Sequence, residues 1–95
     1  MLRGGPFAEF RDGDWEMFRQ TVRGAAENSP DGEDVKWSNS KTGTQGVVRV
    51  VKRYDLPKLG ACRDVAGRTD AEGRVAPFRI TLCRAQGGDW RIKPD

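Results

Sequence analysis

Two cysteines are the residues of this 95-residue chain whose chemistry is easiest to interpret. Cys62 and Cys83 flank a turn sequence, residues 70–73, and their midpoint falls between Glu72 and Gly73. If the flanking strands pair symmetrically about that turn, the two thiols face each other on adjacent strands. We expect a structural disulfide; the alternative is a pair of buried free thiols in a cytosolic protein.

Residues for catalysis or metal binding are sparse. The chain has no histidine, which removes the usual general base, the histidine-containing triads and most zinc sites. Two cysteines cannot complete a four-ligand metal site, and no phosphate-binding or dinucleotide-binding glycine motif occurs. We therefore expect no enzymatic activity, no cofactor and no metal site.

Four other side chains could bind a ligand. Arg63 and Arg84 each follow a cysteine and could grip an anionic group, although salt bridges or solvated positions are commoner for arginine. Trp37 and Trp90 could be stacking platforms for a glycan or a base. A tryptophan on an alternating strand is more often a core residue. We expect structural roles for all four.

The charge is unevenly distributed along the chain. Residues 1–36 hold five basic and eight acidic residues, net −3, whereas residues 37–95 hold twelve and six, net +6. A basic strand region could attract lipopolysaccharide, peptidoglycan or nucleic acid, but dispersed arginines are typical of a solvated sheet face. No apolar run reaches the roughly 18 residues of a membrane-spanning helix, so we expect no transmembrane segment in this chain.

One helix is predicted near the N-terminus. Residues 1–11 have no clear period and are predicted to be irregular, although their phenylalanines could dock on the core. The helix should begin near Asp12 to Asp14, with either aspartate capping its free amides, and end before Pro30. Its apolar stripe consists of Trp15, Phe18, Val22 and Ala25 or Ala26.

The rest of the chain reads as strands. Strands are predicted at 34–39, 45–54, 61–69 and 74–86, with a short last strand around Trp90 and Ile92. Asn39 and Thr42 suit a turn, and Gly46 marks a bulge or a close backbone approach. We predict an α+β fold in which one N-terminal helix packs on a four- or five-stranded, mainly antiparallel sheet. Residues 12–95 should form a single domain with one cross-strand disulfide.

One face of this sheet should lack a cover, because one helix covers only one face. The second strand is apolar on both sides. We expect Val47, Arg49, Val51 and Arg53 to share the face away from the helix. They would form a candidate contact surface for another copy or a neighbouring protein. The alternative is that the N-terminal phenylalanines fold back over that face.

A set of short motifs resembles a known family. In chain order they are Glu27-Asn28-Ser29-Pro30-Asp31-Gly32, Trp37-Ser38-Asn39, Thr42-Gly43, Gly46-Val47, Cys62-Arg63, Cys83-Arg84 and Asp89-Trp90. Together they resemble the C-terminal domain of the bacterial outer-membrane surface antigens, whose best-known member is the rickettsial seventeen-kilodalton antigen.

The resemblance implies an exported, noncatalytic structural or binding domain of the cell envelope. It would lie in the periplasm or at the outer membrane, given an export signal missing from this chain. Its partner would be an envelope protein, another copy or an anionic envelope component. One alternative is a periplasmic inhibitor that inserts residues 70–73 into a wall-active enzyme. Another is a cytosolic nucleic-acid-binding domain that uses the basic sheet face, although we do not expect nucleic acid as a partner.

Overall fold

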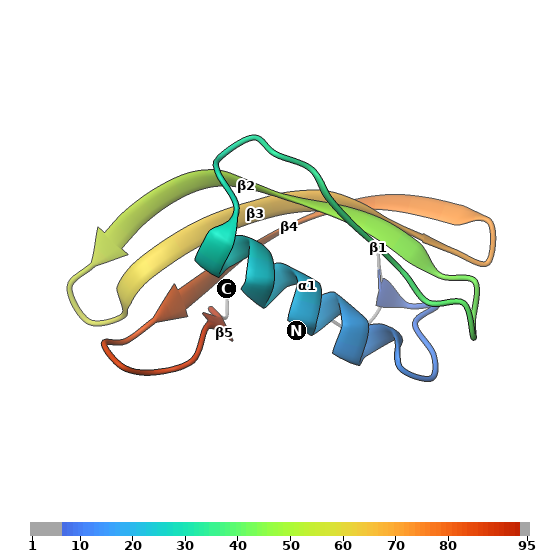
Figure 1. The fold of residues 1–95 in the computed structure, drawn as a ribbon, viewed down its shortest axis with the longest axis horizontal. Helices are drawn as coiled ribbons and strands as arrows, with labels where there is room; N and C mark the ends of the chain where they lie inside the picture. The colour runs from blue at the N-terminus through green and yellow to red at the C-terminus, as the bar shows by residue number, and fades with distance from the viewer. Residues whose placement is uncertain (1–6, 94–95) are drawn as a thin grey trace.

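The computed structural model describes residues 7–93 and shows one helix against one face of a curved sheet (Figure 1). The five strands follow one another in sequence order, and each pairs antiparallel with the next. The predicted α+β class is therefore confirmed. The elements are α1 (Asp14–Asn28), β1 (Val35–Ser38), β2 (Gln45–Leu56), β3 (Gly60–Ala71), β4 (Arg74–Arg84) and β5 (Arg91–Ile92).

Helix α1 buries the predicted apolar stripe. Phe18 and Val22 are fully buried, as are the two alanines one turn later, and Trp15 packs at the edge of the core. The predicted cap is wrong, because the N-cap residue is Gly13 in the left-handed conformation, without a side-chain hydrogen bond. Asp14 lies inside the first turn instead and is itself fully buried.

The N-terminal phenylalanines belong to the core on the helix side of the sheet. The Phe7 ring centroid lies 5.1 Å from that of Phe18 and 5.5 Å from that of Phe78. Phe10 lies 5.7 Å from Trp37 in an edge-to-face contact. The suggestion that these rings cover the opposite face is therefore wrong. The first six residues of the predicted irregular segment 1–11 lie outside the described residues.

The β3–β4 hairpin brings the cysteines together as predicted. Its two central turn residues, Glu72 and Gly73, have φ angles of 54° and 77°, which a type I′ turn requires. The register pairs Cys62 directly with Cys83, and a disulfide joins them. Leu82, the residue before Cys83 in β4, is buried in the core under the helix, so the disulfide lies on the outer face of the sheet.

A bulge changes the phase of β2. The register pairs Val50 with Val65 but Lys52 with Asp64, so Val51 is an extra residue without a partner on β3. Beyond the bulge, Arg53 points to the helix side, where its Nε lies 2.5 Å from Asp31 Oδ1. The expectation that Arg53 shares a face with Val47, Arg49 and Val51 is therefore wrong, because a strict alternation does not continue through a bulge.

The Phe18 ring should contribute strongly to stability. Phe18→Ala is expected to lower the free energy of unfolding by about 3 to 5 kcal/mol, because a fully buried ring leaves a cavity. Chemical denaturation measures this change. Met17→Ala is the matched control, since Met17 is the preceding helix residue and is 37% exposed. Equal effects of the two substitutions would contradict the packing described.

Candidate functional site

A buried carboxylate joins the start of α1 to the turn between β1 and β2. Asp14 Oδ1 accepts hydrogen bonds from Asn39 Nδ2 at 2.8 Å and from Thr42 Oγ1 at 2.7 Å. Its other oxygen accepts the backbone N–H of Arg11 at 2.8 Å. Asn39 and Thr42 lie in the turn, as expected, and they also bind a carboxylate of the helix. Sequence reasoning missed Asp14 as their partner, although it stands at the helix start, where a carboxylate commonly accepts backbone N–H groups.

The hydrogen bonds around Asp14 favour its charged form. Burial alone would raise the pKa of this carboxyl group. The bonds from the Arg11 amide, Thr42 and Asn39 outweigh that effect and hold the pKa below the ordinary value of 3.8. A buried carboxylate whose oxygens are already bonded in this way acts as a structural anchor.

The Trp37 side chain makes a close contact with the backbone of the neighbouring strand. Trp37 is 7% exposed and lies over Gly46, its direct partner on β2. A Cβ atom on Gly46 would be 2.5 Å from Trp37 Nε1 and 2.9 Å from the Arg68 carbonyl oxygen. Of the two predictions for Gly46, the close approach is therefore the right one. Trp37 is a core residue and offers no exposed stacking platform.

The two arginines that follow the cysteines both pack on Trp90. The guanidinium carbons of Arg63 and Arg84 each lie 5.0 Å from the Trp90 ring centroid. Arg84 also pairs with Glu27 of α1 at 2.5 Å. The two arginines therefore lie near each other, on one ring. Trp90 is 5% exposed, so the arrangement fixes the C-terminal strand to the helix.

A polar cluster lies beside the disulfide on the outer face. Asp64 accepts hydrogen bonds from Tyr54 Oη at 2.7 Å and from Thr81 Oγ1 at 2.8 Å, and Arg79 lies 3.5 Å away. Burial would raise the pKa of Asp64, but the bonds from Tyr54 and Thr81 hold it below 3.8. The pKa of Tyr54 is raised, because its phenol already donates to this carboxylate.

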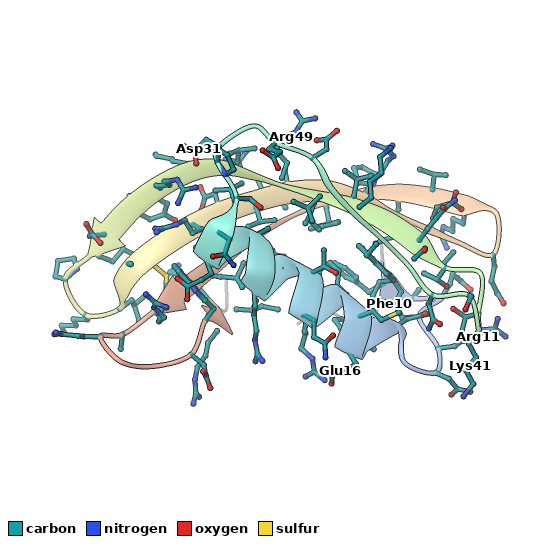
Figure 2. The ribbon with its side chains drawn as sticks, viewed as in Figure 1. Phe10, Arg11, Glu16, Asp31, Lys41 and Arg49 are labelled. Carbon is teal, nitrogen blue, oxygen red and sulfur yellow. A yellow bond between two sulfur atoms is a disulfide. The ribbon has the colours of Figure 1, made fainter. Side chains whose placement is uncertain are left out.

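Three of the four residues predicted as a contact surface lie together on the outer face. Val47, Arg49 and Val51 line one shallow hollow of about 290 Å³ with Ala66 and Arg68. We call these five residues the outer patch. Figure 2 shows Arg49 on the side of the sheet away from α1. Val51 is 37% exposed, whereas Val47 is 8% exposed. The outer patch therefore presents a small apolar centre between Arg68 and Arg49, and Arg49 is paired at 2.7 Å with Asp34, which lines the same hollow.

The β3–β4 turn, expected in one alternative to enter an enzyme cleft, is tied to the N-terminal segment. Glu72 pairs with Arg11 and Arg74 pairs with Glu9, each at 3.6 Å. Within residues 7–93, no group of three or more histidine, cysteine, aspartate or glutamate side chains could hold a metal ion. The helix that these residues form is too short and too polar to cross a membrane.

The Asp14 anchor should make stability depend on acid pH. Because the folded pKa of Asp14 lies below its unfolded value, the stabilisation is complete above about pH 4 and is lost as the pH falls through the folded pKa. Asp14→Ala should lower the free energy of unfolding by about 2 to 4 kcal/mol at pH 7, since it leaves buried donors without an acceptor.

Denaturation curves of the wild type and Asp14→Ala at pH 7 and pH 2.5 test this anchor. The lower pH lies roughly one to two pH units below the pKa of an unfolded aspartate. The difference between the two proteins should shrink at the lower pH. Asp12→Ala is the control, because Asp12 is exposed and lies only two residues before Asp14. A difference that stays constant with pH would contradict the charged anchor.

The Asp64 cluster gives a second pH prediction. Tyr54→Phe removes one hydrogen bond to the carboxylate, so the pKa of Asp64 should rise toward 3.8. A titration followed by carboxyl-carbon NMR measures this shift, and the Asp14 signal in the same spectra should titrate as in the wild type. An unchanged pKa of Asp64 would show that the Tyr54 bond does not form in solution.

Comparison with known proteins identifies the family of this chain. The family model described as the 17 kDa outer membrane surface antigen matches residues 24–91. These residues include the Trp37 motif, both cysteines and Trp90. No curated protein and no solved structure matches the chain. The match covers well over half of the sequence, and the chain belongs to the 17 kDa outer membrane surface antigen family, a family of the cell envelope.

Proposed function

We propose that this domain is a noncatalytic module of the bacterial cell envelope that binds a protein partner through its outer patch. Membership of the surface antigen family supports the envelope as its location, and we infer that the domain itself lies in the periplasm or at the outer membrane. The absence of histidine from the sequence supports a role without acid–base catalysis.

The observation that carries the proposal is the uncovered outer face of the sheet. Helix α1 and the N-terminal phenylalanines all pack on the other side. Within the described part of the chain, no helix or strand lies over the outer patch, and the connection from α1 to β1 borders it, where Asp34 pairs with Arg49 (Figure 1). Val51 therefore remains 37% exposed although it stands in the middle of a central strand.

The composition of the outer patch suits a protein surface as its partner. Val47, Val51 and Ala66 supply apolar contact area, and Arg49 and Arg68 flank it. An apolar centre with a polar rim is common in protein interfaces, where arginine is enriched. The hollow holds only about 290 Å³ and is not enclosed, which favours a complementary protein surface over a small enclosed ligand. Another envelope protein or a second copy of this domain has the required chemistry.

The nucleic-acid alternative has lost its main support. Reduced cysteines and an exposed Trp37 or Trp90 would favour it, whereas the cysteines are bonded and both tryptophans are buried. The inhibitor alternative is favoured by an exposed polar turn at residues 70–73. Glu72 and Gly73 of that turn are exposed, but Glu72 and the neighbouring Arg74 form ion pairs with the N-terminal segment, and we place this alternative second to the outer patch.

Charge placed in the outer patch should abolish association. A photo-crosslinking residue at position 49, beside Val51, should capture a partner in the envelope of the producing cell. The substitution Val51→Glu in the same protein should remove the crosslink, because it buries an unpaired charge at the contact. Light scattering of the purified domain shows whether the partner is a second copy.

Met17→Glu is the matched control for this experiment. Met17 has the same 37% exposure as Val51 but lies on α1, in the other layer. The Met17→Glu substitution should leave the crosslink intact. Both variants should keep the wild-type free energy of unfolding within about 0.5 kcal/mol. A crosslink that survives Val51→Glu, or a Val51→Glu variant that unfolds, would contradict an exposed contact surface.

A further inference from the structure

A second hollow lies at one end of the sheet, away from the outer patch. Two turns flank it: the turn between β2 and β3, and the turn between β4 and β5, which Figure 1 shows at the same end of the molecule. The hollow has a volume of about 630 Å³ and shares no residue with the outer patch. We call it the end hollow.

The lining of the end hollow is mostly apolar. Leu59, Cys83, Ala85 and Ile92 contribute to it. Leu59 is 39% exposed at the tip of a turn. A polar residue at such a surface position would lose no buried apolar area. Cys83 brings the outer side of the disulfide to the wall of the hollow. This is apolar surface that the folded domain leaves open to solvent.

The rim of the end hollow is cationic. Lys58, Arg91 and Lys93 line it together with a single acidic residue, Asp89. All four side chains are exposed. None of the three cations forms an ion pair with any of residues 7–93, whereas Arg49 and Arg53 elsewhere on the sheet are paired with aspartates. The rim therefore carries more positive than negative charge, because Asp89 offsets only one of the three cations.

We propose that the end hollow docks on a membrane surface that contains anionic phospholipid. A lipid acyl chain could contact the apolar lining, and a negatively charged lipid phosphate could pair with the three cations. An apolar side chain surrounded by lysine and arginine is the usual composition of an interfacial membrane contact, in which basic residues also gain from the negative surface potential. This proposal concerns a different surface from the outer patch and stands independently of it.

Vesicle co-sedimentation tests the proposal. The disulfide-bonded protein should bind vesicles that contain phosphatidylglycerol and should not bind vesicles of phosphatidylcholine alone. The double substitution Lys58→Glu and Lys93→Glu should weaken binding by well over the roughly fivefold expected for loss of one basic charge at an anionic surface. Leu59→Gln, which keeps the charge, should weaken binding by about fivefold or more through loss of apolar contact.

Matched variants at the opposite end of the sheet control for general charge and hydrophobicity. Lys36→Glu with Lys41→Glu changes the formal charge by the same amount, and Lys41 lies at the far end from the end hollow (Figure 2). Val75→Gln is the control for Leu59→Gln, because Val75 is 60% exposed near the β3–β4 turn. Both controls should bind anionic vesicles with at least half of the wild-type affinity.

Several results would overturn the proposal. Equal losses for the two charge-reversed pairs would show nonspecific attraction by the basic protein as a whole. Equal binding to neutral vesicles would exclude a role for the cationic rim. If glycerol phosphate without acyl chains competed as well as the lipid, the site would be an anion site alone. Val51→Glu should bind vesicles like the wild type, so failure of the outer patch and failure of the end hollow remain distinguishable.

Discussion

The carboxylate of Asp14 has no solvent contact where the start of α1 meets the turn between β1 and β2. Its hydrogen bonds span 25 and 28 residues to Asn39 and Thr42. Without an acceptor at this position, donors from two segments, the N-terminal segment and the β1–β2 turn, would be unsatisfied, which is costly inside a protein. The anchor therefore determines where the helix begins on the sheet and keeps Phe18 over the central strands.

The position of the helix determines which surfaces remain for function. A layer of one helix and two N-terminal phenylalanines covers one face of five strands, and the opposite face carries the disulfide, the Asp64 cluster and the outer patch. The motifs on which the family resemblance rested lie mostly on the covered side. Trp37 packs over Gly46, and Trp90 packs under two arginines. These residues stabilise the scaffold, whereas the outer patch and the end hollow are the surfaces we propose for binding.

Periodicity and symmetry predicted the local structure well. The stripe through Phe18 and the pairing of Cys62 with Cys83 both depend on neighbours in sequence or across one hairpin, so spacing suffices to place them. The bulge at Val51 could not be predicted, because alternation gives no sign of an extra residue in an apolar run. The partners of Asp14 and the end hollow depend on contacts between distant segments. A leucine at the exposed position 59, between Lys58 and Gly60, was the available signal for the hollow.

A double-mutant cycle between Asp14 and Thr42 tests the anchor most directly. The free energies of unfolding of Asp14→Ala, Thr42→Val, the double variant and the wild type give the coupling between the two side chains. Their 2.7 Å contact, made to a fully buried carboxylate, predicts a coupling of about 1 to 3 kcal/mol at pH 7. A coupling below about 0.3 kcal/mol would mean that the two substitutions act independently, and it would contradict the anchor.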